Sequence, residues 1–369
     1  MKPTTEAASP RIRLPAEWEP QDGVMLTWPH AGTDWAPMLD TAVACFAAIV
    51  REIVKRERCL IVCRDAAEVR RALPDLYAEL LICELETDDT WARDHGPISV
   101  FEDGCPCLLD FTFNGWGMKF AAAHDNLITR ELYRRGFFQP QVAYRNQLHR
   151  VLEGGAIESD GQGTLLTTAT CLLSANRNDH YSKAELETFF KEAFGLDRIL
   201  WLRHGYLAGD DTDSHIDTLA RLCDARTIAY VQSDDPTDEH DDALRRMEEE
   251  LRAFRTVDGH PYTLISLPMA DPVHDPEDGH RLPATYANFL ILNGAVLVPT
   301  YASPKDVLAL ERLDGAFPGR EIVGIDCRPL IRQHGSLHCV TMHIPSGFLK
   351  VQKAEQCPQK KLCASAPLR

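Results

Sequence analysis

The sequence of 369 residues lacks the features that mark several specialised classes of protein. Residues 1–13 are polar and contain no apolar stretch, so we expect no signal peptide. No stretch reaches the roughly 18 consecutive apolar residues that a membrane-spanning helix needs. Low-complexity segments, long Gly/Ser linkers and evident internal repeats are also missing. These absences predict a globular, cytoplasmic protein without a membrane partner.

Metal-binding patterns are missing too, although the chain has twelve cysteines. Cys59 and Cys63, and likewise Cys105 and Cys107, are close in sequence, but no second Cys or His pair lies near either of them, so we expect no metal site. A chain of this length, with 44% hydrophobic residues, can build a core without disulfides. We therefore predict reduced thiols.

The chain has fewer basic than acidic residues. Its 39 Lys and Arg residues and 55 Asp and Glu residues give a formal net charge of −16. Nucleic-acid partners favour a basic surface, so the balance argues against them. A negative field concentrates cations and suits a small cationic substrate, although it also serves solubility.

Apolar runs of strand length alternate with amphipathic stretches, which indicates an α/β fold. Strands are predicted near 24–27, 60–62, 227–231, 289–292, 295–298, 321–325 and 340–344, and helices over 40–55, after a capping box at Ser182–Glu185, and over 241–254. Asp160-Gly161 predicts a hairpin turn, and 268–283 predicts a surface loop. No boundary divides the chain, so we expect one domain over 14–350, a polar segment at 1–13 and a mobile tail at 351–369.

Five short segments carry side chains suited to chemistry. They are WARDHGP at 91–97, NGWG at 114–117, EGG at 153–155, GDDTDSHID at 209–217 and GSLHCVT at 335–341. Asp94 and Glu153 lie beside glycines and could face a cleft, or they could be a turn-forming Asp and an exposed strand-end Glu. The glycines around Trp116 predict an exposed aromatic platform on a flexible loop, or a plain hairpin turn.

The last two segments hold a histidine and a cysteine. On an extended strand, His215 and Asp217 would point the same way and place imidazole beside carboxylate. The acids before His215 resemble a calcium loop, but the glycine and closing glutamate of an EF-hand are absent, and a surface acidic loop is the other alternative. Cys339 directly precedes a predicted strand. It could be a nucleophile, or it could be a small buried apolar residue.

Taken in order, the motifs W-x-R-D-x-G-P, E-G-G, D-x-x-x-H-x-D and G-x-x-H-C-x-T resemble the agmatine deiminase and bacterial peptidylarginine deiminase family. Segments 15–20, 27–30 and 282–289 also look familial, so the resemblance runs from about 14 to about 350. It implies a pentein-type α/β propeller of five ββαβ-like units around a pseudo-fivefold axis, with the active site in the central channel. The family also suggests a homodimer.

The resemblance implies a hydrolase acting on C–N bonds of linear amidines. Agmatine would become N-carbamoylputrescine and ammonia, a reaction of putrescine biosynthesis, through a covalent S-alkylthiouronium on Cys339 and without a cofactor. By this resemblance Cys339 is the nucleophile, His215 is the general acid and base, and Glu153 orients His215. The resemblance also implies that Asp94 and Asp217 bind the guanidinium. Further contacts with the substrate would come from Trp91, Trp116 and Asp211. Because carboxylates disfavour a thiolate, we also expect a raised pKa for Cys339 in the empty site.

One departure from the family pattern leaves the substrate open. Many agmatine deiminases carry Gly-Gly-Gly-Asn-Ile before His-Cys, whereas here the residues are His334-Gly335-Ser336-Leu337. A deiminase for free or peptidyl arginine would need a cationic group near the substrate's α-carbon, and Arg93, Arg177 and Arg203 are the candidates. An amidinotransferase, a non-catalytic polyamine-binding protein and a Cys/His peptidase are further alternatives.

Overall fold

The computed structural model describes residues 11–350, and the strands in this part of the chain form five separate sheets. In order of pairing, the first sheet contains β1 (Ile12–Arg13), β5 (Ile98–Glu102), β6 (Cys105–Thr112) and β7 (Ala143–Val151), and the second contains β10 (Arg198–Leu202), β9 (Thr164–Thr168) and β8 (Ile157–Ser159). The third contains β11 (Ala220–Asp224), β12 (Thr227–Gln232) and β13 (Thr263–Pro268), and the fourth contains β14 (Leu290–Leu292), β15 (Ala295–Thr300) and β16 (Glu321–Asp326). The fifth contains β17 (Thr341–Pro345), β2 (Gln21–Thr27), β3 (Arg58–Cys63) and β4 (Leu81–Glu84).

Every described sheet repeats one pairing pattern. An antiparallel pair shares its second strand with a parallel pair: β17–β2–β3, β5–β6–β7, β8–β9–β10, β11–β12–β13 and β14–β15–β16. Parallel neighbours need a crossover, and a helix lies in each one. These helices are α1 (Leu39–Val54), α5 (Ile128–Arg134), α8 (Lys183–Phe194), α10 (Asp241–Ala253) and α11 (Asp306–Ala316). The sequence showed no such repeat, because the units share their pairing rather than their residues.

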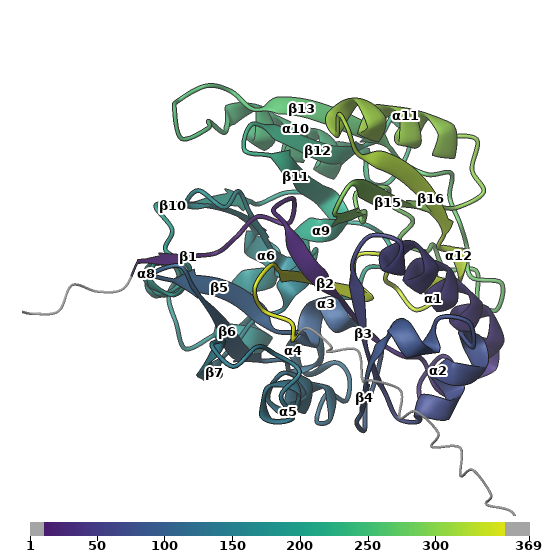
Figure 1. Cartoon of the computed structure of the whole chain (residues 1–369). Coiled ribbons are helices and arrows are strands. Elements are labelled where there is room, and N and C mark those ends of the chain that lie inside the picture. Colours follow the sequence, from purple (N-terminus) through teal and green to yellow (C-terminus); the bar gives the residue numbers. More distant parts are fainter. Residues whose placement is uncertain (1–10, 351–369) are drawn as a thin grey trace, which may run out of the picture.

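A short helix or 3-10 turn leads into three of the antiparallel pairs. Helix α3 (Ala92–His95) leads into β5, the 3-10 turn η4 (Gly154–Ala156) into β8, and helix α9 (Ile216–Leu219) into β11. Figure 1 shows α3 and α9 near the middle of the molecule, whereas α1, α2 (Ala66–Ala72) and α11 lie at its periphery. Strand β17 pairs with β2, so the two ends of the described chain meet in one sheet.

The remaining described elements are short connections. They are η1 (Ala36–Met38), η2 (Tyr77–Glu79), α4 (Gly115–Met118), η3 (Asp125–Leu127), α6 (Ala169–Leu172), α7 (Ala175–Asn178) and α12 (Arg328–Ile331). None of the helices between residues 11 and 350 is long and apolar enough to cross a membrane.

Most local predictions are confirmed. Ser182 and Glu185 form the expected capping box at the start of α8, and Asp160-Gly161 lies in the turn between the antiparallel strands β8 and β9. Helix α1 buries one apolar face, which includes Phe46, Val50 and Ile53. Ten of the twelve cysteines lie in the described part, and all ten are free thiols.

The predictions for the chain ends concern residues that are mostly not described. The predicted tail at 351–369 and residues 1–10 of the predicted polar segment lie outside the described range. Ile12 and Arg13 belong to that segment but form β1, which pairs with Glu102 and Phe101 of β5.

Candidate active site

Three of the predicted catalytic side chains lie next to Gly155, and a fourth, Cys339, lies beside one of them. A Cβ atom at this glycine would lie 2.6 Å from Nδ1 of His215, 2.8 Å from Oδ1 of Asp94 and 3.2 Å from Oδ2 of Asp217. Nδ1 of His215 lies 3.6 Å from Oδ1 of Asp94, and Sγ of Cys339 lies 3.8 Å from Oδ2 of Asp217. Any larger residue in place of Gly155 would push these groups apart, which is the physical reason for a glycine here.

His215 and Asp217 do not lie on a strand, and that prediction was wrong. His215 immediately precedes helix α9, and Asp217 lies in its first turn. The turn before them is tight, because Asp213 and Ser214 adopt left-handed backbone conformations with φ of 65° and 63°. Arg177 stabilises this turn by donating hydrogen bonds to the Asp213 carboxylate and the Thr212 carbonyl. The helix, not a strand, therefore brings the imidazole and the carboxylate to one site.

Asp94 projects from α3 into the protein interior. Its Oδ2 accepts a 2.9 Å hydrogen bond from Nε1 of Trp116, and its Oδ1 accepts a 3.1 Å bond from the Gly155 N–H. Burial, together with the negative charges of Asp217 and Glu153, raises the pKa of Asp94 well above its usual value. Asp94 therefore keeps its proton to an unusually high pH until a cation arrives.

The prediction of an exposed platform at Trp116 was wrong, because only 6% of this residue is exposed. Gly115, Trp116 and Gly117 all have positive φ, so the chain turns inward at this point. The indole packs edge-to-face against Phe113 and Trp91. The two glycines thus place the ring beneath the Asp94 carboxylate instead of presenting it to solvent.

Asp217 belongs to a buried chain of charged groups. Its Oδ2 contacts Nδ1 of His338 at 2.8 Å, and Nε2 of His338 contacts the Glu17 carboxylate at 2.7 Å. Burial alone would raise the pKa of Asp217, but the hydrogen bond with His338 and the charges of His338, His215 and Arg221 lower it below its usual value. Of the two carboxyl groups of Asp94 and Asp217, that of Asp217 therefore stays ionised in the empty site.

Cys339 lies just before β17 and is held by Asn288. The Asn288 side-chain oxygen lies 3.4 Å from Sγ and accepts hydrogen bonds from the backbone N–H groups of His338 and Cys339. Its side-chain nitrogen donates to the Asp217 carbonyl. Burial and the charges of Asp217 and Asp94 raise the pKa of the Cys339 thiol well above its usual value, which confirms that expectation.

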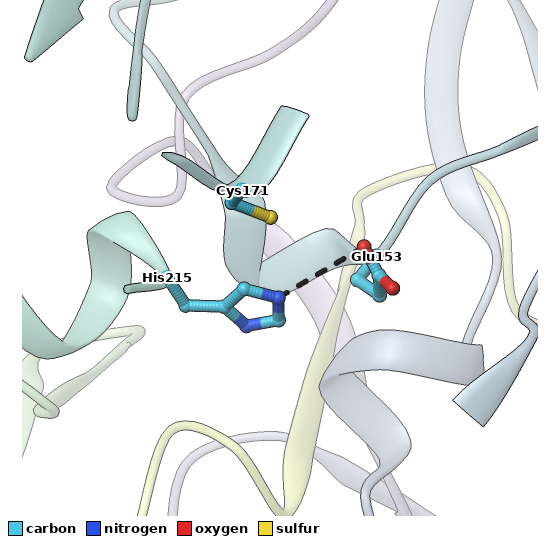
Figure 2. A group of neighbouring side chains, drawn as sticks. All are labelled: Glu153, Cys171 and His215. Carbon is cyan, nitrogen blue, oxygen red and sulfur yellow. Dashed lines mark ion pairs between the residues drawn. The ribbon is translucent and has the colours of Figure 1, made fainter. Parts of the chain in front are cut away.

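Glu153 and Cys171, the latter from α6, lie next to His215 (Figure 2). Nε2 of His215 is 3.9 Å from Oε2 of Glu153, so this contact is an ion-pair distance rather than a hydrogen bond. Burial lowers the pKa of His215 to about 3, and neither of its ring nitrogens has a hydrogen-bond partner in the described structure. The imidazole is therefore neutral at pH 7, and burial makes it a weak base in the empty site.

The same three side chains place potential metal-binding atoms within 4.8 Å of one another. However, Nε of Arg177 donates to both oxygens of Glu153 at 2.9 Å. This fixed positive charge opposes a metal ion at Glu153. We interpret the cluster as an electrostatic environment for His215.

A pocket that encloses about 400 Å³ of empty space, part of it open solvent, leads to Cys339. It is lined by Asp34, Asp89, Trp91, Asp94, Trp116, Phe120, Asp211, Thr212, Gln333, His334, Gly335 and Cys339. Four of these residues are aspartates, and none is lysine or arginine. Asp89 accepts hydrogen bonds from the indoles of Trp35 and Trp91, and burial raises its pKa to about 6. His215, Asp217 and Glu153 are buried and are not among the residues that line this pocket.

A second cavity of about 490 Å³ lies elsewhere. Glu17, Arg93, Glu158 and His343 contribute its charged and titratable groups. None of Cys339, His215, Asp94 and Asp217 lines it, so the smaller pocket is the better candidate for an active site.

Comparison with known proteins identifies the family of this chain. A model of the Porphyromonas-type peptidyl-arginine deiminase family matches residues 13–345. The chain belongs to this family. The agmatine deiminase of Pseudomonas aeruginosa (strain LESB58) is 32% identical over 93% of this chain and 98% of that protein.

Solved structures extend the similarity to the fold of this deiminase family. A cysteine-to-serine variant of C. jejuni agmatine deiminase with substrate bound is 36% identical, with a TM-score of 0.85 over 93% of this chain and 98% of that one. A Porphyromonas gingivalis protein with the provisional name arginine deiminase is 56% identical, with a TM-score of 0.88 over 92% of this chain and 100% of that one. The mixed α/β fold is therefore the pentein fold of these deiminases, as the resemblance implied.

Sequence reasoning missed several groups in the site of this deiminase family member. Asn288 holds the loop that contains Cys339, His338 links Asp217 to Glu17, and Arg177 forms an ion pair with Glu153. The only sequence signals were indirect, because His338 precedes Cys339 and Asn288 lies in a familial segment. Their partners are distant along the chain, so only the fold reveals these roles.

Proposed function

We propose that this hydrolase of the C–N bonds of linear amidines converts agmatine and water to N-carbamoylputrescine and ammonia. The observation that carries the proposal is the pocket, which combines four aspartates with a buried thiol and contains no lysine or arginine. Agmatine has a guanidinium at one end, an ammonium at the other and no carboxylate. An acidic pocket without a cationic side chain matches that charge pattern.

The arginines considered as clamps for a substrate carboxylate have other partners. Arg93 is buried against Glu17 and His343, and Arg177 is buried against Glu153 and Asp213. Arg203 is exposed and does not line the pocket. These positions support agmatine over free arginine.

Asp94 and Asp217 are the proposed ligands of the guanidinium. A guanidinium is planar and presents its N–H groups in a fixed fork, so two carboxylates can fix its plane through paired hydrogen bonds. Sγ of Cys339 lies 3.8 Å from Oδ2 of Asp217, and this short distance supports an attack by the sulfur on the carbon of a guanidinium held by Asp217. Because the thiol and the guanidino carbon are held close together in a fixed orientation, the barrier to their reaction is lowered.

The proposed reaction has two halves. The thiol of Cys339 gives its proton to neutral His215, and the sulfur forms a bond to the guanidino carbon. His215 then protonates one nitrogen, the C–N bond breaks, and ammonia leaves an S-alkylthiouronium on Cys339. Water loses a proton to His215, and the resulting hydroxide attacks the same carbon. The C–S bond then breaks, the hydroxyl proton of the adduct passes to the sulfur, and the ureido product is released. His215 gives its proton to solvent or to the departed ammonia and becomes neutral again. The oxidation state of carbon does not change in either half.

The five sheets also support a more detailed proposal for the fold. We propose that each repeated pattern is one ββαβ-like unit and that the units surround a pseudo-fivefold axis within one domain over 14–350. The residues of the site precede the first strand of successive patterns: Asp94 precedes β5, Glu153 precedes β8, Asp217 precedes β11, Asn288 precedes β14 and Cys339 precedes β17. Equivalent positions around one axis would explain why they meet.

Direct assay tests the proposed activity. Purified protein is incubated with agmatine, free arginine or a blocked arginine amide, and both ammonia and the ureido product are quantified. We expect agmatine to give both products in equal amounts, with the highest kcat/KM of the three. Ureido product from an arginine substrate but none from agmatine would contradict the proposal.

Arginine deimination is the second candidate, because the 56% identical P. gingivalis protein carries that provisional name. The same nucleophile and carboxylate pair would serve it. The pocket, however, offers the α-carboxylate of arginine no lysine or arginine. The assay above separates the two substrates directly.

The raised pKa of Asp94 predicts how binding depends on pH. Only the ionised carboxylate pairs with a guanidinium, whereas the empty site retains the Asp94 proton to a higher pH than usual. The affinity of the Cys339→Ala variant for agmatine should therefore rise as the pH increases through the raised Asp94 pKa. Asp217 has a lowered pKa and is already ionised there. Calorimetric titration checks this, and an affinity that does not change from acidic to neutral pH would contradict it.

Gly335 provides a steric test of the role of Trp91. A Cβ atom at Gly335 would lie 2.1 Å from Cζ3 of Trp91, so Gly335→Ala must displace the indole. We expect kcat/KM for agmatine to fall by about 10- to 100-fold, because small misplacements in a site have effects of that size. Gly315→Ala is the matched control, since no atom lies within 4 Å of that position. If Gly335→Ala folds and its kinetics are unchanged, Trp91 does not contact the substrate.

A further inference from the structure

His334 at the rim of the pocket holds a side chain where the backbone favours glycine. Its φ is 68°, in the left-handed region, and the residue is half-buried. Counted back from His-Cys, this position is a glycine in the Gly-Gly-Gly-Asn-Ile pattern of many agmatine deiminases. The imidazole is therefore additional bulk in the wall of this pocket.

Two contacts fix the imidazole of His334 in place. Its Nδ1 lies 2.8 Å from the carbonyl oxygen of Gly209, and its ring stacks on His280 with centroids 5.5 Å apart. A carbonyl can only accept, so Nδ1 is the donor, and Nε2 is the nitrogen left for other partners. The ring thus forms a fixed part of the rim.

Asp211 lines the same pocket beside His334. Burial raises the pKa of Asp211, and the nearby charges of His334 and Lys119 partly offset that effect. The ammonium of Lys119 donates to the Asp211 carbonyl and to the Asp213 carboxylate. No hydrogen bond from another described residue reaches the Asp211 carboxylate, which leaves it available to a cation in the pocket.

We propose that His334 determines substrate specificity by narrowing the pocket near Asp211 to the width of an unbranched alkylammonium. This role of His334 rests on the proposed function. The ammonium of a linear guanidinoalkylamine reaches Asp211 past the ring. A carboxylate or peptide group on the carbon beside that nitrogen collides with the imidazole. Arginine and peptidyl arginine are thus excluded by bulk as well as by charge.

Two variants separate bulk from chemistry. His334→Gly removes the side chain, whereas His334→Asn keeps much of the bulk, and both residues tolerate a left-handed backbone. The measured quantity is the ratio of kcat/KM for agmatine to kcat/KM for benzoyl-arginine amide. We expect His334→Gly to lower this ratio by about 10-fold or more, and His334→Asn to keep it within about threefold.

Three other outcomes would overturn the proposed role of His334. An unchanged ratio in a folded His334→Gly protein overturns it and leaves the proposed function intact. An equal fall in both variants also overturns it, because the chemistry of the imidazole and not its bulk would then set the ratio. A wild-type protein that turns over the blocked arginine but not agmatine overturns the proposed function together with the role of His334.

Discussion

Replacing Cys339 with alanine is expected to reduce agmatine turnover by about five to six orders of magnitude, the size of effect seen when a hydrolase loses its nucleophile. No other described thiol lines the pocket, because Cys339 is the single cysteine among its lining residues. Substrate binding should survive, since Asp94 and Asp217 remain in place. Loss of kcat with retained affinity is therefore the expected signature.

A buried cysteine away from the site provides the control for this substitution. Cys223 lies in β11, is also buried, and does not line the pocket. Cys223→Ala should keep the wild-type kcat, even if it lowers the melting temperature by removing buried volume. Ammonia released from agmatine by Cys339→Ala at more than about one-hundredth of the wild-type rate would mean that Cys339 is not the nucleophile.

Asp94→Asn is expected to lower kcat/KM for agmatine by about a thousandfold or more, because it removes a charge that pairs with the guanidinium in a water-poor site. Asparagine has nearly the same shape but only one acceptor oxygen. The indole of Trp116 and the N–H of Gly155 now bind separate oxygens of Asp94, so one donor loses its partner. An unpaired buried donor costs about 1–3 kcal/mol of stability, so thermal unfolding must be measured beside the kinetics.

Two further variants make the Asp94 result specific. Asp258 is exposed and paired with Arg226, so Asp258→Asn should change neither stability nor kinetics. Trp116→Phe removes the indole N–H that donates to Asp94, together with part of the buried ring, but it keeps the Asp94 charge and should have a smaller effect on kcat/KM than Asp94→Asn. A Cys/His peptidase would tolerate the loss of the Asp94 charge. Near-normal kcat/KM in a folded Asp94→Asn protein would therefore contradict the deiminase mechanism.

Much of the local structure followed from the sequence because its signals are local. The capping box at Ser182, the apolar face of α1 and the Asp-Gly turn at 160–161 depend on residues a few positions apart. The repeated sheet pattern did not follow from it. Its pairings join residues far apart in sequence, such as Thr341 of β17 with Leu26 of β2, and the units share geometry without obvious sequence identity.

For the site, too, the sequence predicted some features and not others. Ordered motifs pointed to Cys339, His215, Asp94, Asp217 and Glu153 through family resemblance, and the fold brings these side chains together. Sequence reasoning failed where the backbone conformation decides the direction of a side chain. Trp116 turns inward because of a left-handed run, and His215 precedes a helix. Periodicity alone cannot predict positive φ at Asp213 or Ser214, which shapes that turn.

Trapping the intermediate tests the central claim most directly, namely that Cys339 forms a covalent bond to the guanidino carbon of agmatine. Protein mixed with agmatine is quenched with acid within one turnover, and its intact mass and peptides are measured. The mechanism predicts an added mass equal to agmatine less ammonia, located on the peptide that contains Cys339 and absent from Cys339→Ala. Rapid turnover of agmatine with no adduct at any quench time, or with the adduct on another residue, would contradict it.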